Sequence, residues 1–167
     1  FYGVNYYQPT RVGAPGQVSA AAAAQGLTGE LAAAVPFSLL DQPEHPRTDF
    51  GWPVVPDGLR RLLLEVRDRY PALPPVHITE NGCSHAPIDD AFRVDFLDAH
   101  LRAVAAAIDD GVDVRGYWTW SLLDNWEWDD GFEQRFGLVH VDYDTLVRTP
   151  KDSFEAYRAV IASQRPD

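Results

Sequence analysis

Apolar runs of strand length alternate along this chain with segments whose apolar residues recur at helical spacing. Three runs rich in aromatic and β-branched residues predict strands: residues 1–7, 76–79 and 112–120. Helices are predicted from Asp57, over about Asp90 to Asp110, and from Pro150. The order of elements is therefore strand, loop and helix, three times over.

The helical spacing also predicts which side chains face inward. The first helix should bury Leu59, Leu62, Leu63, Val66 and Tyr70, and the second should bury Val94, Leu97, Leu101, Val104 and Ile108. Residues 8–56 hold many prolines and glycines, and their Ala-rich patch at residues 19–34 fits a helical turn or two. Long loops of this kind in compact domains are usually functional or disordered.

Alternating strands and helices predict an α/β protein with a parallel sheet that is covered on both faces. Three strands do not close a barrel and leave two unpaired sheet edges, so partner strands are expected upstream of Phe1. A doubly wound sheet is the alternative, but no glycine-rich nucleotide motif follows any strand. In either fold, chemistry gathers at the carboxyl ends of the strands, here Asn5 to Tyr7, Glu80 to Asn81, and Trp120 onward.

Composition narrows the classes of partner. The 167 residues are 46% hydrophobic and 23% charged, as in ordinary globular proteins. Their formal charge of -11 argues against a nucleic acid partner, and no apolar run is long enough to cross a membrane. The single cysteine, Cys83, is expected to be a small apolar filler; a reactive thiol is the alternative.

Glu80 ends an apolar strand, so its carboxylate should lie beside packed side chains and still face a cleft. That position suits a nucleophile or a general acid/base. For a lone glutamate, a solvated carboxylate that caps the next element is the favoured interpretation. The residues that surround Glu80 therefore decide between the two.

Four of the five tryptophans fall within eleven residues, among acidic and amide side chains: Trp118, Trp120, Trp126 and Trp128. Flat aromatic faces pack against sugar rings while carboxylates accept hydroxyl protons, so this mixture favours carbohydrate recognition. Buried aromatics beneath a solvated acidic loop are the alternative.

Metal and cofactor chemistry finds no support in the sequence. An EF-hand-like loop with its glycine at Gly131 would need an oxygen ligand at Trp126 and a glutamate at Gly137. The five histidines are scattered without zinc-site spacing, and His100 is expected to pack within its helix. No G-x-S-x-G elbow indicates a serine hydrolase.

Several segments together resemble family 1 glycoside hydrolases, the β-glucosidases and their relatives. The resemblance is carried, in family order, by Gly3-Val4-Asn5-Tyr6-Tyr7, by Gly51-Trp52 before Pro56-Asp57-Gly58, by Ile78-Thr79-Glu80-Asn81-Gly82, and by Trp120-Ser121-Leu122-Leu123-Asp124-Asn125-Trp126-Glu127-Trp128 followed by Arg135-Phe136-Gly137. The matches span nearly the whole chain. The resemblance implies the carboxyl-terminal part, about strands six to eight, of a (β/α)8 barrel, with residues 1–167 as one partial domain and residues 8–56 as a long substrate-side loop.

The resemblance also implies a retaining β-glycoside hydrolase that works through a covalent glycosyl-enzyme and uses no cofactor. Glu80 matches the nucleophile, Tyr7 its hydrogen-bond donor, and Asn5 a polar residue of the same pocket. The positions that match sugar-binding residues are Trp120, Glu127 and Trp128, with Phe136 as a pocket wall and Trp52 on the aglycone side.

The substrate implied is a β-glucoside or a related oligosaccharide. Family enzymes for 6-phosphorylated sugars carry serine at the position of Glu127 and a nearby lysine; this acidic loop has neither, so a phosphorylated sugar is disfavoured. Glucose, fucose and galactose are not distinguished by these residues. A cytoplasmic location is a family-level expectation.

The acid/base glutamate of the family lies in a T-x-N-E-P segment, and this sequence contains none. The retaining mechanism needs two carboxyl groups, so the chain is expected to need a missing N-terminal barrel half. The alternatives are a truncated glycosidase and a catalytically inactive carbohydrate-binding fragment.

Overall fold

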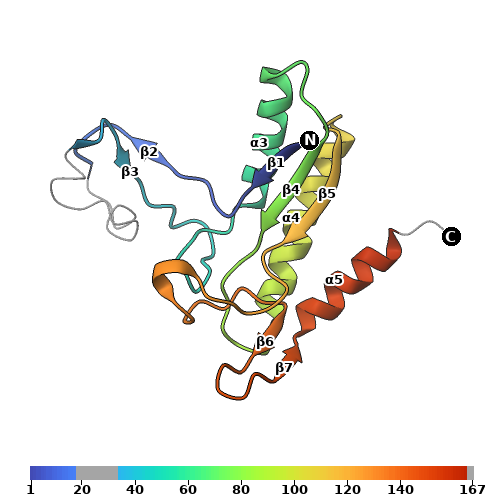
Figure 1. Cartoon of the computed structure of the whole chain (residues 1–167). Helices are drawn as coiled ribbons and strands as arrows, with labels where there is room; N and C mark the ends of the chain where they lie inside the picture. The colour runs from blue at the N-terminus through green and yellow to red at the C-terminus, as the bar shows by residue number, and fades with distance from the viewer. Residues whose placement is uncertain (18–33, 165–167) are drawn as a thin grey trace.

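A three-stranded parallel sheet forms the centre of the protein. The computed structural model describes residues 1–17 and 34–164, and its sheet has the order β1 (Tyr2–Asn5), β4 (Val76–Asn81), β5 (Val114–Thr119) (Figure 1). The predicted parallel α/β arrangement is confirmed. In this described part of the chain, β1 and β5 each have one edge that pairs with no strand.

Helices cover one face of the sheet. Figure 1 shows α3 (Pro56–Arg69) and α4 (Ala91–Asp109) behind the strands, and α5 (Asp152–Ser163) packs against α4. The core between sheet and helices is apolar: Val4, Tyr6, Leu59, Leu63, Val76, Ile78, Val104, Ala107 and Val112. On the other face, Trp118 stacks on His77 and is 52% exposed. The prediction of a sheet covered on both faces is therefore wrong for the described residues.

The buried face of α4 is broader than the apolar spacing predicts. Its buried side chains follow three- and four-residue steps: Arg93, Phe96, Leu97, His100, Ala103, Val104 and Ala107. Ile108 is 46% exposed, and Tyr70 lies beyond the end of α3 and is 51% exposed. Both were expected inside. Arg93 and His100 occupy the inward positions instead, because the carboxylate of Asp90 pairs with Arg93 and the ring of His100 stacks on Phe96.

Several boundaries differ from the sequence-based prediction. The strand expected to end at Thr79 continues through Glu80 and Asn81. Pro150 does not open the last helix; it ends β7 (Arg148–Pro150), which pairs antiparallel with β6 (Val139–Val141). Asp144 and Thr145 lie in the turn between these two strands, where both backbone N–H groups donate to Asp142 Oδ1.

The described parts of the long loop, residues 8–17 and 34–55, are mostly irregular. Within them β2 (Val12–Gly13) pairs with β3 (Ser38–Leu39), and this small ribbon projects from the rest in Figure 1. The helical turns expected at residues 19–34 lie, apart from Ala34, outside the described residues. A single 3-10 turn, η1 (Trp128–Asp130), interrupts the loop after β5.

Cys83 and His100 are both buried, as the sequence predicts. Cys83 has no exposed surface, and burial raises the pKa of its thiol to about 12, so the thiol stays neutral. None of the helices in the described ranges has the length and apolar character needed to span a membrane.

We predict that His100 makes the stability of the chain depend on pH. Burial lowers its pKa from 6.5 to about 4, so between these values the unfolded chain binds a proton that the folded chain excludes. This contribution to stability is present above pH 6.5 and is lost as the pH falls toward 4, by about 3 kcal/mol at most.

Denaturant unfolding between pH 4 and 7 tests this prediction by comparing the parent with His100→Leu. The variant should lose the part of the pH dependence that His100 causes, whereas His45→Gln, at a partly exposed position, should keep the parent profile. Parallel profiles for parent and His100→Leu would contradict the prediction.

Candidate active site

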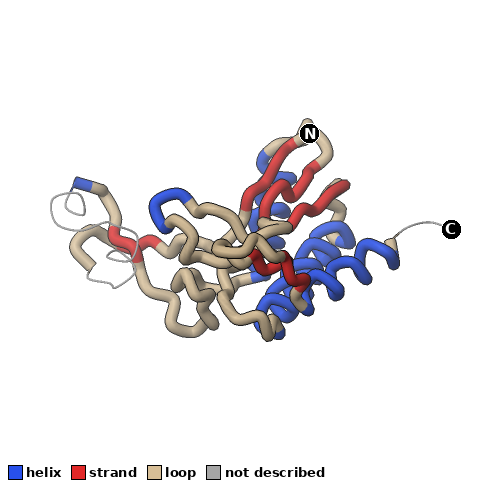
Figure 2. Tube along the Cα trace, turned by 60° about the horizontal axis from the view of Figure 1, so that its bottom comes forward, coloured by secondary structure: helices blue, strands red, loops and turns tan. Residues whose placement is uncertain are grey.

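The parallel register brings three strand ends to one edge of the sheet. The backbone N–H of Tyr6 donates to Glu80 O, and that of Trp120 donates to Asn81 O, both at 2.9 Å. In Figure 2 the loops that follow these strands gather on that side of the sheet. The segments carrying Tyr7, Glu80 and Trp120 therefore lie side by side, although they are far apart in the sequence.

Glu80 is held by a tyrosine. The hydroxyl of Tyr7 donates to Glu80 Oε2 at 2.6 Å, a short distance typical of a hydrogen bond to a charged acceptor. Burial, then the hydrogen bond and charge of Glu80, raise the pKa of Tyr7 far above its usual value, so Tyr7 stays a donor. Glu80 does not cap α4, which begins eleven residues later at Ala91, after its N-cap residue Asp90.

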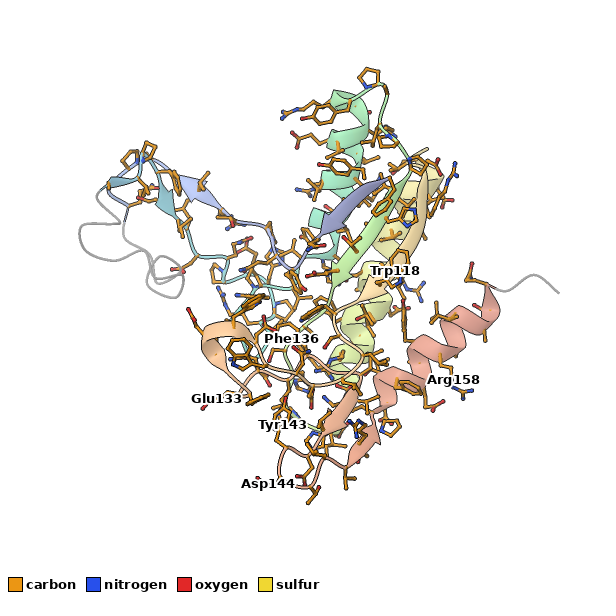
Figure 3. All side chains as sticks on the ribbon, viewed as in Figure 1. Trp118, Glu133, Phe136, Tyr143, Asp144 and Arg158 are labelled. Carbon is orange, nitrogen blue, oxygen red and sulfur yellow. The ribbon has the colours of Figure 1, made fainter. Side chains whose placement is uncertain are left out.

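Aromatic rings enclose this pair on one side. The ring centroid of Tyr7 lies 5.5 Å from that of Trp52 and 6.2 Å from that of Phe136. Phe50 stacks on Trp52 at 4.4 Å. Phe136 is buried at 2% exposure, and Figure 3 shows it in the interior, while Glu133 lies at the periphery. Phe50 is a member of this wall that the motifs did not indicate.

Trp120 and Glu127 form a second pair. Burial, together with the charges of Asp130 and Glu80, raises the pKa of Glu127, and the neighbouring Trp120 side chain lowers it by less. Glu127 Oε2 is buried and has no hydrogen-bond partner among the described residues. The carboxylate thus presents an acceptor that a ligand hydroxyl could use.

Two of the predicted site residues lie apart from these pairs. Trp128 is 74% exposed in η1, where its ring contacts Trp126 at a centroid distance of 6.0 Å. Asn5 pairs in register with Glu80 along the strands, but its Oδ1 accepts a hydrogen bond from Thr79 at 2.6 Å.

Asn81 and Gly82 hold the strand ends together, and sequence reasoning gave neither a role. Asn81 is fully buried: its amide donates to Tyr6 O, and its Oδ1 accepts from the Tyr117 hydroxyl, both at 2.6 Å. A Cβ at Gly82 would lie 1.8 Å from Trp120 O, so only glycine fits there. Their places directly after Glu80 were the available signal.

The described ranges contain no group of three or more histidine, cysteine, aspartate or glutamate side chains arranged to hold a metal ion. The arrangement at the sheet edge is instead a carboxylate with a fixed phenol donor, aromatic walls and a second carboxylate with an open acceptor. Such an arrangement, on a segment of an α/β protein, can accept hydrogen bonds from the hydroxyl groups of a ligand and pack against its apolar faces.

The chain belongs to glycosyl hydrolase family 1, whose family model matches residues 1–166. It is 40% identical over 166 residues to a β-glucosidase of Agrobacterium sp., covering 96% of this chain and 33% of that protein. It is 38% identical over 125 residues to a 6-phospho-β-galactosidase of Streptococcus equi subsp. zooepidemicus, covering 71% of this chain and 27% of that protein.

Among solved structures, the β-glucosidase of Thermotoga maritima in complex with azafagomine is similar, with a TM-score of 0.83 and 34% sequence identity. The match covers 99% of this chain and 35% of that chain. The chain therefore spans about a third of the length of these relatives, and its fold fits a fragment of their barrel.

We predict that Gly82→Ala destabilises the chain and displaces Trp120, because the added Cβ would overlap a backbone oxygen that no side-chain rotation moves. The melting temperature should fall by several degrees, and the tryptophan fluorescence of the folded state should shift. Gly3→Ala is the control, since its Cβ would meet Thr79 at an ordinary 3.4 Å. Equal melting temperatures for the two variants would contradict the prediction.

Proposed function

We propose that this chain is part of a retaining β-glycoside hydrolase and carries its nucleophile, Glu80. The observation that carries the proposal is the 2.6 Å hydrogen bond from Tyr7 to Glu80, at the carboxyl ends of the paired strands β1 and β4. This hydrogen bond orients the Glu80 carboxylate, and an oriented carboxylate suits nucleophilic attack. Membership of a glycosidase family supports the same assignment.

In the proposed reaction, an oxygen of Glu80 bonds to the anomeric carbon while the bond to the aglycone oxygen breaks. The leaving oxygen takes a proton from a second carboxyl group, and water then releases the sugar by attack on the same carbon. This second group must lie about 5 to 5.5 Å from the nucleophile. The sequence has no T-x-N-E-P segment, so we propose that the acid comes from outside these 167 residues.

The sugar is proposed to lie against Trp120, with its hydroxyls on Glu127. The buried Oε2 of Glu127 supports this assignment because no residue in the described part of the chain donates a hydrogen bond to it. Trp128 would donate from the loop that carries Glu127, Asn5 would line the pocket next to Glu80, and Phe136 would wall it.

Trp52 would contact the aglycone. Trp52 belongs to the loop of residues 8–56, where it stacks on Phe50, and its ring contacts that of Tyr7, the hydrogen-bond donor to Glu80. These contacts support a substrate-side role for that loop. We further propose that β1, β4 and β5 are strands six to eight of the barrel, that residues 1–167 form one partial domain, and that the remaining strands form its partner.

An unphosphorylated β-glucoside or a related oligosaccharide is the proposed substrate. Some relatives are 6-phospho-β-galactosidases, but the charges of Asp130 and Glu80 already raise the pKa of Glu127 and would repel a phosphate. The turnover of 4-nitrophenyl β-glucoside should therefore exceed that of its 6-phosphate at equal concentration. Preference for the phosphorylated substrate would contradict this assignment.

We predict that Glu80→Gly, in a form of the protein that hydrolyses β-glycosides, loses turnover by several orders of magnitude because no group remains to attack the anomeric carbon. Azide should restore turnover and give the inverted α-glycosyl product. In the parent, a 2-fluoroglycoside should label Glu80, as read by peptide mass. Glu133→Gln, an exposed glutamate of the neighbouring loop, is the control and should behave like the parent.

The results separate the proposal from its alternatives. Near-normal turnover by Glu80→Gly, or a label on another residue, would show that Glu80 is not the nucleophile. Sugar binding that Glu80→Gln leaves unchanged, without turnover under any condition, would indicate a carbohydrate-binding fragment. Turnover of nitrophenyl glucoside by the 167 residues alone would contradict the proposed origin of the acid.

We also predict that Tyr7→Phe lowers kcat/KM by about 10- to 100-fold, since a hydrogen bond to a charged group contributes about 1.5–3 kcal/mol. The folded structure should persist, because Phe keeps the contacts of the ring with Trp52 and Phe136. An unchanged kcat/KM would remove Tyr7 from the reaction.

A further inference from the structure

Asp124 is buried inside a loop whose neighbouring side chains face solvent. Its side chain has no exposed surface, whereas Leu122, Trp126 and Trp128 are 58%, 57% and 74% exposed. Burying a carboxylate is costly unless it is hydrogen-bonded and paired with opposite charge. The partners of Asp124 therefore show what the residue holds in place.

Both oxygens of Asp124 bind the chain segment that returns toward the sheet after the loop. Oδ1 accepts from the backbone N–H of Gly137 at 2.8 Å, and Oδ2 accepts from that of Val141 at 3.2 Å. Three basic side chains surround the carboxylate with nitrogen–oxygen distances of 3.3 to 3.6 Å: Arg135, His140 and Lys151. Arg135 and Lys151 balance the negative charge, from the segment before β6 and from the residue before α5, and the His140 ring lies beside them.

A second set of contacts closes the same loop. Arg135 donates to Val141 O at 2.9 Å, and its guanidinium lies 4.0 Å from the centroid of the Tyr143 ring. The Tyr143 hydroxyl donates to Asn125 O at 3.2 Å. Figure 3 shows Tyr143 and Phe136 in the same region below the sheet. Asp124 and its neighbour Asn125 are therefore both tied to residues 135–143.

These ties act on two side chains of the proposed site. Phe136, which contacts Tyr7 and Trp52, directly precedes Gly137, and Glu127 lies three residues after Asp124. A Cβ at Gly137 would lie 2.2 Å from the Asp124 nitrogen, so the two backbones are in direct contact. A displacement of Asp124 would move the wall of the pocket and its hydroxyl acceptor together.

We infer that Asp124 is a positioning residue, which sets Phe136 and Glu127 relative to Glu80 and itself touches no substrate. The inference rests on the proposed function for its kinetic consequence, but its structural part is independent of activity. Two variants separate charge from position: Asp124→Asn keeps the size and removes the charge, and Asp124→Glu keeps the charge and displaces the carboxylate by one methylene. Asp129→Asn, an exposed carboxylate of the same loop, is the control.

Hydrogen–deuterium exchange of the 167-residue chain tests the structural part. Peptides covering residues 124–141 should exchange about ten times faster in Asp124→Asn and Asp124→Glu, because their backbone donors lose a charged acceptor. Peptides of α4 should exchange as in the parent, and Asp129→Asn should match the parent throughout. Parent-like exchange in residues 124–141 of either folded variant would overturn the inference, as would uniformly faster exchange over the whole chain.

Kinetics in a glycoside-hydrolysing form of the protein test the consequence. Both Asp124 variants should raise KM about ten-fold and change kcat less, since the nucleophile and Tyr7 stay in place while the sugar contacts shift. A loss of kcat that is equal in the two Asp124 variants, with an unchanged KM, would overturn the positioning role. A parent without any turnover would contradict the proposed function instead, and the exchange experiment would still decide whether Asp124 holds the loop.

Discussion

The parallel pairing of β1, β4 and β5 is the constraint on which the candidate site depends. It brings Tyr7, Glu80 and Trp120 to one edge of the sheet although more than a hundred residues separate the first from the last. The backbone hydrogen bonds at this edge continue past the strands, from Tyr6 to Glu80 and from Trp120 to Asn81. Val76 and Ile78 of β4 lie in the core, so a regular alternation of side chains would also turn Glu80 toward the helices. The register shifts between Val4 and Asn5 and between Ile78 and Asn81 interrupt this alternation at Glu80.

Glycine and asparagine make this edge possible. The buried amide of Asn81 satisfies a carbonyl of one neighbouring segment and the phenol of Tyr117 on the next strand, so it joins all three strands. Gly82 lets the backbone of Trp120 approach to a distance that any side chain would prevent. Asn81 and Gly82, which directly follow Glu80, therefore hold the backbone at the proposed nucleophile. Tyr7, in the segment that follows β1, holds its side chain by a hydrogen bond.

Local patterns predicted the three strands of the parallel sheet and the three helices. The strand ends indicated the edge of the sheet at which the structure brings Tyr7, Glu80 and Trp120 together. The local patterns failed where tertiary contacts override spacing. Arg93 lies on the buried face of α4 because it pairs with Asp90 and donates to the carbonyls of His85 and Arg135, partners that no helical period reveals. The hairpin of β6 and β7 was not predicted, because Pro150 was interpreted as the start of a helix. Proline cannot donate a backbone hydrogen bond, but as the last residue of an edge strand it disturbs the pairing of the two strands little.

The candidate site was predictable to the extent that its residues follow strand ends. Glu80, Tyr7 and Trp120 do, whereas Phe50 belongs to a long loop and Asp124 is connected to the site through buried ion pairs.

Two kinds of carboxylate occur in this acidic chain. Asp124 is surrounded by basic side chains and stabilises the fold. Glu127 meets the negative charges of Asp130 and Glu80, and one of its oxygens has no partner within residues 1–17 and 34–164. Carboxylates that repel each other destabilise the fold. They favour a ligand whose hydroxyl groups donate hydrogen bonds to them. On the proposed function, they also favour a transition state in which positive charge develops at the anomeric carbon.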